Sequence, residues 1–313
     1  MLPLAVMIMA GYVLNRRGWV DAGFNRQLSL VLMNLFYPCL IVSSIVRNFT
    51  VSSLLENWMM PVGAFFILTM GWVVGALTLP LLKQQPQPTQ RCYHFVCMVN
   101  NYSFLPILLA ASLWGEKAIA LIIVSSLGSE LCVWTLGIKA LTGQKFQRGS
   151  LGHLLNLPIL ALLSAGVLLV LHGLGAVYGC LPSEGSMTAE VLATLSETLR
   201  MIGVATLPAS ALICGSRIAM LHPSRVFSGL MLGTCALRLL VIPALCIAVF
   251  FLVAMPWEIR RVLMLIAIQP VSMASVSLAE VYGVDADFSA AAILLTHLFC
   301  LVTIPLWLGL ILA

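Results

Sequence analysis

The chain consists almost entirely of long apolar stretches separated by short polar joints. In a helix, about 20 consecutive apolar residues are enough to cross the hydrocarbon core of a bilayer. Ten stretches of this kind occur, at residues 1–14, 28–46, 58–82, 92–114, 119–141, 157–174, 194–216, 226–254, 261–282 and 290–313. The pattern predicts an all-α polytopic membrane protein with about ten transmembrane helices.

The composition excludes several other classes of protein. Charged residues make up 9% of the chain and hydrophobic residues 61%, whereas about a quarter of the residues in a soluble domain are charged. So few charges exclude a soluble globular domain, a disordered chain and a basic face that binds nucleic acid. The joints are too short for a catalytic domain, and the chain has no GxSxG, HExxH or nucleotide-binding loop. We therefore predict that the protein is not an enzyme.

The basic residues are distributed unevenly between alternate joints. The odd-numbered joints contain ten, which are Arg16, Arg17, Arg26, Lys83, Arg91, Lys139, Lys145, Arg148, Arg217 and Arg225. The even-numbered joints contain four, which are Arg47, Lys117, Arg260 and Arg261. Basic loops stay on the cytoplasmic side of a membrane. The count predicts cytoplasmic odd joints and two periplasmic termini in the inner membrane of a bacterium.

Cysteine and histidine give no sign of a metal site. Most of the nine cysteines lie inside apolar stretches and no CxxC pair occurs, so we interpret them as small side chains packed between helices. The histidines are scattered singly, without neighbours at a zinc-ligand spacing. The sequence predicts no metal, no disulfide and no cofactor.

A weak internal repeat appears when residue 101 is laid on residue 269, a shift of 168. Both copies contain a polar helix with proline, an aromatic-glycine turn at Trp114-Gly115 or Tyr282-Gly283, and then an apolar helix. Five spans per copy is an odd number, so the two copies have opposite orientations in the membrane. We predict a first five-helix repeat at 1–141, a cytoplasmic connecting loop at 142–156 and a second, inverted repeat at 157–313.

Polar residues and proline interrupt an apolar span in both copies. A simple proline kink satisfied by Ser and Asn explains one such span, but matching interruptions favour a pair of unwound helices at a binding site. The predicted substrate-binding residues are Asn100, Asn101, Tyr102, Ser103, Gln269, Pro270 and Ser272. The predicted helix-crossing and gating residues are Pro106, Pro270 and Arg238.

Two ionisable side chains, Arg238 and Glu130, lie in the middle of apolar spans. An ionisable group at that depth costs a few kcal/mol and is functional by default. In a purely structural interpretation the two side chains pair with each other. In the functional interpretation, Arg238 binds an anion or gates, and Glu130 carries a proton.

Several of these segments resemble a known family. The runs Asn101-Tyr-Ser-Phe-Leu, Leu113-Trp-Gly-Glu, Gln269-Pro-Val-Ser and Leu278-Ala-Glu-Val-Tyr-Gly-Val-Asp, with the ending Thr303-Ile-Pro305, are similar to the auxin efflux carrier family of PIN-like transporters, in its bacterial branch. The similarity covers essentially the whole chain and is most specific over residues 261–313.

The resemblance implies a sodium/proton antiporter-like fold with crossing broken helices 4 and 9. It also implies a scaffold of spans 1, 2, 6 and 7, a mobile bundle of spans 3–5 and 8–10, and a homodimer formed through the scaffold. The family's substrates imply malonate-like, malate-like or indole-acetate-like acids.

We expect a secondary transporter, a permease or efflux carrier, that moves a small organic mono- or dicarboxylate by elevator-type alternating access. The half-helix N-termini and Arg238 favour an anion, and the crossing segments contain no acidic residue before Glu280. The flux is either electrogenic uniport or coupled to protons. The alternative is a membrane sensor or partner subunit that uses the same fold without transporting.

Overall fold

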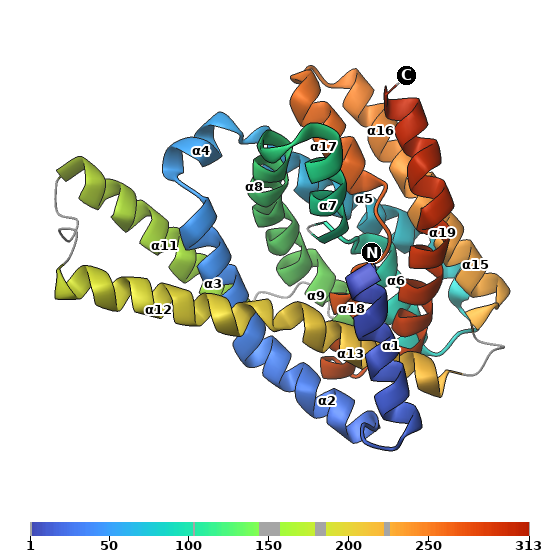
Figure 1. Cartoon of the computed structure of the whole chain (residues 1–313). Coiled ribbons are helices and arrows are strands. Elements are labelled where there is room, and N and C mark those ends of the chain that lie inside the picture. The colour runs from blue at the N-terminus through green and yellow to red at the C-terminus, as the bar shows by residue number, and fades with distance from the viewer. Residues whose placement is uncertain (1, 103, 144–156, 179–185, 222–225, 313) are drawn as a thin grey trace.

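The computed structural model describes residues 2–102, 104–143, 157–178, 186–221 and 226–312, and within them it is helical apart from turns, short extended segments and one β-bridge (Figure 1). The expected connecting loop at 142–156 lies outside these residues except for its first two positions. The first half of the chain contains α1 (Leu2–Arg16), α2 (Ala22–Val31), α3 (Tyr37–Asn48), α4 (Val51–Glu56), α5 (Met59–Thr78), α6 (Gln87–Met98), α7 (Phe104–Trp114), α8 (Glu116–Cys132) and α9 (Ile138–Thr142).

The second half contains α11 (Leu157–Tyr178), α12 (Met187–Val204), α13 (Thr206–Met220), α15 (Gly229–Ala236), α16 (Ile242–Leu252), α17 (Trp257–Ala267), α18 (Ala274–Val281) and α19 (Ala286–Leu312). Three π-helical turns, at Leu32–Phe36, Val133–Gly137 and Leu237–Val241, join α2 to α3, α8 to α9 and α15 to α16. A 3₁₀ turn, Leu79–Leu82, follows α5.

Within the described residues, six helical runs are long and apolar enough to cross a membrane. They are Ala22–Asn48, Met59–Leu82, Lys117–Thr142, Met187–Met220, Gly229–Leu252 and Ala286–Ile311, and shorter apolar helices cover Leu105–Trp114 and Leu160–Gly175. The prediction of a polytopic helical membrane protein is therefore confirmed.

Several helices begin earlier than the apolar stretches indicated, and two of them begin at a capping side chain. Helix α2 begins at Ala22 instead of residue 28, because Asp21 accepts a hydrogen bond from the backbone N–H of Phe24 at 2.8 Å. Helix α12 begins at Met187 instead of residue 194, because Ser186 accepts from the N–H of Ala189. Capping side chains satisfy the first N–H groups of a helix, so each helix starts in a polar turn that hydropathy does not detect.

Prolines follow two of the π-helical turns. Pro243 has no N–H to donate to the carbonyl of Leu239, and the indole Nε1 of Trp307 in α19 donates to that carbonyl at 2.8 Å. Such replacement is needed because water is absent from the bilayer core. The same arrangement of a π turn and a proline occurs at Pro38 near the start of α3.

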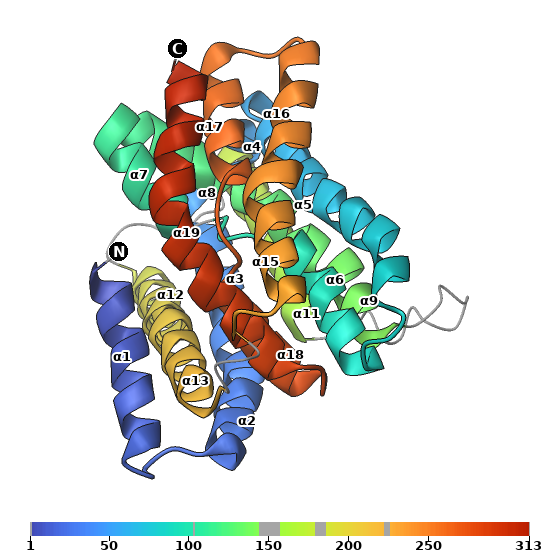
Figure 2. The same ribbon diagram turned by 90° about the vertical axis from the view of Figure 1, so that its right-hand side faces the viewer.

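The helices pack as two groups. In the first group α1 and α2 pack on α13, and α3 packs on α11 and α12. In the second group α5 packs on α6, α8, α16 and α17, while α19 packs on α6, α15 and α18. Figure 2 shows α1, α12 and α13 on one side and α5, α6 and α16 on the other. The two groups meet where α13 contacts α18 and α19, where α2 contacts α18, and where α3 contacts α8.

Glycines let α1 and α13 approach until their backbones touch. A Cβ atom at Gly215 would lie 1.9 Å from the carbonyl oxygen of Ile8, and one at Gly11 would lie 2.2 Å from that of Leu212. Small residues at contacts between membrane helices permit this close packing, because there is no hydrophobic drive between helices in lipid.

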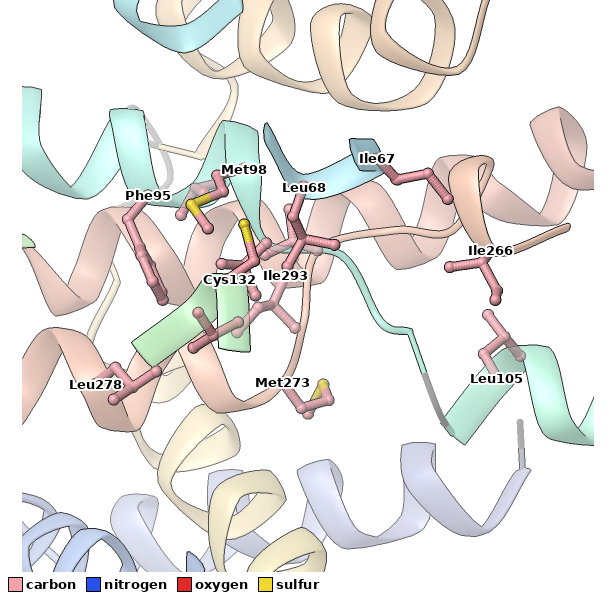
Figure 3. Close-up of a cluster of buried hydrophobic side chains, with 14 of the residues drawn as sticks. Ile67, Leu68, Phe95, Met98, Leu105, Cys132, Ile266, Met273, Leu278 and Ile293 are labelled. Atoms are coloured by element: carbon pink, nitrogen blue, oxygen red, sulfur yellow. The ribbon is translucent and has the colours of Figure 1, made fainter. Parts of the chain in front are cut away.

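Many of the fully buried apolar side chains surround the middle of the second group. Phe95, Met98, Ile266, Leu278 and Ile293 are examples, each at most 1% exposed. Figure 3 shows these residues around two extended backbone segments that pass each other. The core thus encloses the point where two helices are interrupted.

Candidate functional site

The site is built around two helix interruptions that contact each other, and we call this contact the crossing. Residues 99–103 separate α6 from α7, and residues 268–273 separate α17 from α18. An isolated antiparallel β-bridge joins Asn100 to Val271. The N–H of Asn101 donates to the Pro270 carbonyl at 2.7 Å, and the N–H of Ser272 donates to the Val99 carbonyl at 3.1 Å. Each unwound segment therefore satisfies backbone groups of the other, as a bilayer requires.

Equivalent turns follow the two interruptions. Gly115 joins α7 to α8 with φ +74°, and Gly283 lies between α18 and α19 with φ +63°. The two glycines are 168 residues apart (283 minus 115), which equals the shift of the sequence repeat. Residues with a side chain rarely adopt this left-handed conformation.

One side of the crossing holds the carboxyl ends of two half-helices. Arg238, which is fully buried, donates from one terminal nitrogen to the Cys97 carbonyl of α6 at 3.1 Å and from the other to the Ala267 carbonyl of α17 at 2.9 Å. Asn100 Nδ2 donates to Ile266, and Gln269 Nε2 donates to Leu265 at 2.7 Å. These donors face the negative ends of the helix dipoles. Arg238 bonds carbonyls here instead of pairing with Glu130.

The other side of the crossing opens into a cavity of about 320 Å³. The first helix group forms one wall with Tyr37, Leu40, Ile41, Ser44, Ile45, Gly203, Val204, Thr206, Leu207 and Ser210. The second group forms the opposite wall with Asn101, Tyr102, Ile107, Ser126, Leu127, Glu130, Ser272, Met273 and Ala274. Cavities of this size and mixed character bind small molecules. The cavity therefore lies between two groups of helices and is lined by both.

Glu130 is the one charged side chain among the described residues that line this cavity. Its Oε1 accepts a hydrogen bond from the Tyr102 hydroxyl at 2.7 Å, and its Oε2 accepts from Trp134 Nε1 at 2.8 Å. The indole can only donate, whereas a phenol can donate or accept. Oε1 is therefore the atom at which a proton can be gained or lost while both contacts persist. Tyr37 of the first group packs edge-on against Trp134, with ring centroids 5.7 Å apart.

Asn101 and Ser272 connect the cavity to the half-helices that begin there. Asn101 Oδ1 accepts from the N–H of Leu105 in the first turn of α7 at 3.4 Å. Ser272 Oγ accepts from the N–H of Ala274, the first residue of α18, also at 3.4 Å. Helix N-termini carry partial positive charge, so both half-helices present that charge toward the cavity.

The residues predicted from sequence thus divide into two sets. Asn101, Tyr102, Ser272 and Glu130 line the cavity together. The buried residues Asn100, Gln269, Pro270, Pro106 and Arg238 do not line it, and the first three lie in the crossing itself. Ser103 lies outside the described residues.

The sequence analysis did not single out five polar residues of the cavity, Tyr37, Ser44, Ser126, Thr206 and Ser210. Thr206 and Ser210 are four residues apart and hence on one face of α13. That spacing within an apolar span was a signal that could have identified them. Tyr37 directly precedes Pro38, but nothing in its own segment indicates that it faces the second group.

The helices, the paired interruptions and the cavity between the two helix groups define a polytopic membrane protein with an internal cavity large enough for a small molecule. The model of a family described as membrane transport protein matches residues 1–150 and 151–308. The chain belongs to this family, that of the auxin efflux carriers, and the resemblance seen in the sequence is confirmed. An uncharacterized transporter of Methanocaldococcus jannaschii is 25% identical over 98% of this chain and 96% of that protein. The protein is accordingly a membrane transporter.

Proposed function

We propose that the protein is a secondary transporter of a small organic anion, such as a mono- or dicarboxylate, and that the anion binds in the cavity beside the crossing. The observation that carries this proposal is that two separately packed groups of helices form the opposite walls of that cavity. A site on such a boundary changes its exposure when the groups move past each other.

The proposed architecture has ten spans in an inverted five-plus-five repeat, with repeats at 1–141 and 157–313. The first helix group acts as the scaffold and the second as the bundle that carries substrate in an elevator-type motion. The closely similar spacings of the two interruptions and of Gly115 and Gly283 support the repeat. Inverted repeats produce two access states when their halves exchange conformations.

An anion is favoured by the electrostatics of the crossing. The N-terminal ends of α7 and α18 point their partial positive charge toward the cavity, while Arg238 neutralises the carboxyl ends of α6 and α17 on the far side. We propose that Asn101, Tyr102 and Ser272 contact the substrate directly. Asn100, Gln269 and Arg238 act by holding the crossing in place.

The position of Glu130 in the cavity favours transport of the anion together with a proton. A carboxylate in the same cavity repels a bound anion, whereas a protonated carboxyl does not. Substrate and proton therefore favour each other's binding, and Glu130 Oε1 is the proposed proton site. An anion moving without a proton would instead be carried by electrogenic uniport.

The proposed location is a bacterial inner membrane, with both termini in the periplasm. The structure supports a common side for several odd joints: Arg26 lines a pocket with Arg217 and Asp287, and Asp285 of the same pocket accepts a hydrogen bond from Thr89. A homodimer formed through the first helix group is also part of the proposal.

The competing function is a sensor that binds the anion without moving it. The test combines two measurements on purified protein: the shift in melting temperature with each of a panel of carboxylates, and the flux of the same compounds into protein-containing liposomes. We expect every compound that stabilises the protein strongly also to be transported. Stabilisation by a carboxylate without any flux of it would favour the sensor.

A further inference from the structure

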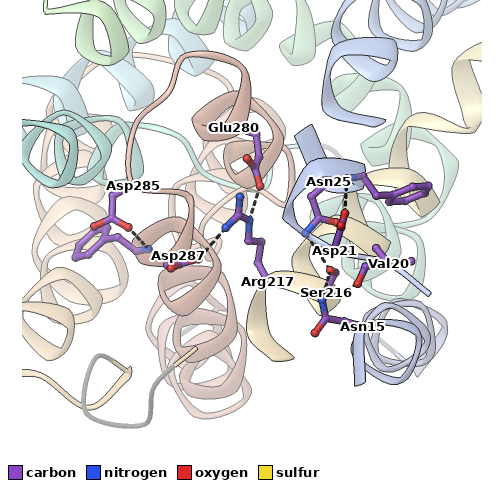
Figure 4. Close-up of polar contacts among 11 residues, drawn as sticks. Asn15, Val20, Asp21, Asn25, Ser216, Arg217, Glu280, Asp285 and Asp287 are labelled. Carbon is purple, nitrogen blue, oxygen red and sulfur yellow. Dashed lines mark hydrogen bonds and ion pairs between the residues drawn. The ribbon is translucent and has the colours of Figure 1, made fainter. Parts of the chain in front are cut away.

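A cluster of ion pairs joins the two helix groups at the end of the molecule that contains the odd joints. Arg217 of α13 donates through Nε to Glu280 of α18, and one of its terminal nitrogens lies 3.2 Å from Oδ1 of Asp287 in α19 (Figure 4). The Arg217 side chain is 15% exposed and that of Glu280 6% exposed. A surface pocket of about 460 Å³ lies against them. We call this end of the molecule the Arg217 face.

The other ion pairs of the described residues stay within one group. Glu197 of α12 pairs with Arg47 of α3 and with Arg200 of its own helix, all in the first group. Lys117 of α8 pairs with Glu258 of α17, both in the second group. A motion that separates α13 from α18 and α19 must therefore break the Arg217 pairs, while it can leave these others intact.

The cavity and the ion pairs lie on the same faces of the helices that meet between them. On α13, Thr206 and Ser210 line the cavity, and Arg217 follows them by eleven and seven residues respectively, spacings that keep all three on one helix face. Met273, directly before α18, lines the cavity, and Glu280 of α18 follows seven residues later on the same face. The helix between Ser210 and Arg217 is about 10 Å long.

Buried hydroxyl groups lie along this seam. Ser277 is between Met273 and Glu280 on α18 and is 2% exposed, and Ser29 of α2, which packs on α18, is fully buried. Among the described residues, no group hydrogen-bonds to the hydroxyl of Ser277, Ser29, Thr206 or Ser210. Burying an unpaired hydroxyl costs free energy. The cost is understandable if these groups are hydrated in a second conformation.

We propose that the seam between α13 and α18, flanked by α2, is the route by which the cavity opens to the Arg217 face, and that the ion pairs of Arg217 with Glu280 and Asp287 hold it closed in this structure. The proposal rests on the proposed transport function, because only a transporter needs access to its cavity from both sides of the membrane. The anion would pass the hydroxyls of Ser210 and Ser277, which can donate hydrogen bonds to it.

The test measures the accessibility of Ser277 and requires no substrate. Ser277→Cys is introduced into the full chain in membrane vesicles, and a membrane-impermeant methanethiosulfonate is added from either side. The native cysteines of the described residues are buried, so the unmodified protein gives the baseline. With Arg217 present we expect slow reaction. Adding Arg217→Gln should raise the rate roughly tenfold or more from the Arg217 face only, because a buried charge pair is lost.

Arg200→Gln is the matched control, because it removes an ion pair inside the first group, and it should leave the rate unchanged. Glu280→Gln should act like Arg217→Gln, whereas Arg217→Lys keeps a positive charge between Glu280 and Asp287 and should retain the slow reaction. Equal rates with and without Arg217, or the same increase in the Arg200→Gln protein, would overturn the proposal. A protein that shows the expected labelling but no flux of any carboxylate would refute the proposed function and leave the route in place.

Discussion

Asn101 differs from its neighbour Asn100 in the direction of its side chain. In an extended segment successive side chains point to opposite sides. Asn100 consequently reaches the carboxyl end of α17, whereas Asn101 lines the cavity. The two amides therefore have different proposed roles. Asn100 stabilises the crossing, and Asn101 contacts the substrate.

We expect Asn101→Leu to abolish carboxylate uptake while leaving a folded protein. The amide at the cavity is lost, and the missing cap on α7 costs only about 1 kcal/mol. The measurement is uptake into liposomes together with the melting temperature of the purified variant. Asn48→Leu is the control, because Asn48 is exposed and bonds only the Ser44 carbonyl of its own helix. Uptake by Asn101→Leu equal to that of the control would remove Asn101 from the site.

Glu130→Gln should remove the pH dependence of transport. If the anion binds together with a protonated Glu130, wild-type uptake is greatest at low pH and falls as rising pH ionises the carboxyl. Glutamine can still accept from Trp134 and donate to the Tyr102 oxygen, but it cannot titrate. Uptake measured across the pH range should therefore be flat.

The control for this prediction is Glu56→Gln, which changes an exposed carboxyl in α4 and should retain the wild-type pH profile. A falling profile that persists in Glu130→Gln would assign proton coupling elsewhere. Complete loss of uptake at every pH, with normal folding, would show that the carboxyl itself contacts the substrate.

At the scale of elements, Arg238 ties two half-helices together. Arg238→Met leaves the Cys97 and Ala267 carbonyls unpaired in the core, at a cost of about 1–3 kcal/mol for each. We expect a clearly lower Tm in detergent, with an intermediate value for Arg238→Lys, because an ammonium does not reproduce the fork of a guanidinium. Arg16→Met, at an exposed position, should change stability by less than about 0.5 kcal/mol. Equal Tm values for Arg238→Met and Arg16→Met would contradict this role.

The elements themselves were largely predictable from sequence, and the contacts between them were not. Apolar length indicates the spans, and prolines with polar residues mark both interruptions near 101 and 269. The partners of Arg238 are backbone carbonyls, which have no sequence signature. Likewise, the choice between Asn100 and Asn101 depends on which segment lies opposite. Thr206 and Ser210 face the cavity because of how α13 packs on α18, a contact between residues distant in the chain.

At the scale of the whole molecule, the alternation of basic joints predicts the orientation. Cysteines introduced at Gln84 and Glu56, both exposed, should react with an impermeant thiol reagent from opposite sides of the membrane, with Gln84→Cys reacting from the cytoplasm. Labelling in right-side-out and inverted vesicles gives the answer. Reaction of both positions from one side would contradict the alternation on which the inverted repeat depends.

The two helix groups share one cavity, and the central claim is that a small organic anion crosses the membrane there. The most direct test is counterflow in liposomes containing the purified protein, loaded with one carboxylate and exposed to others carrying a radioactive label. We expect saturable counterflow of at least one mono- or dicarboxylate in the wild type and none in Asn101→Leu. Saturable flux of a cation or a neutral sugar that excess carboxylate does not inhibit would contradict the account.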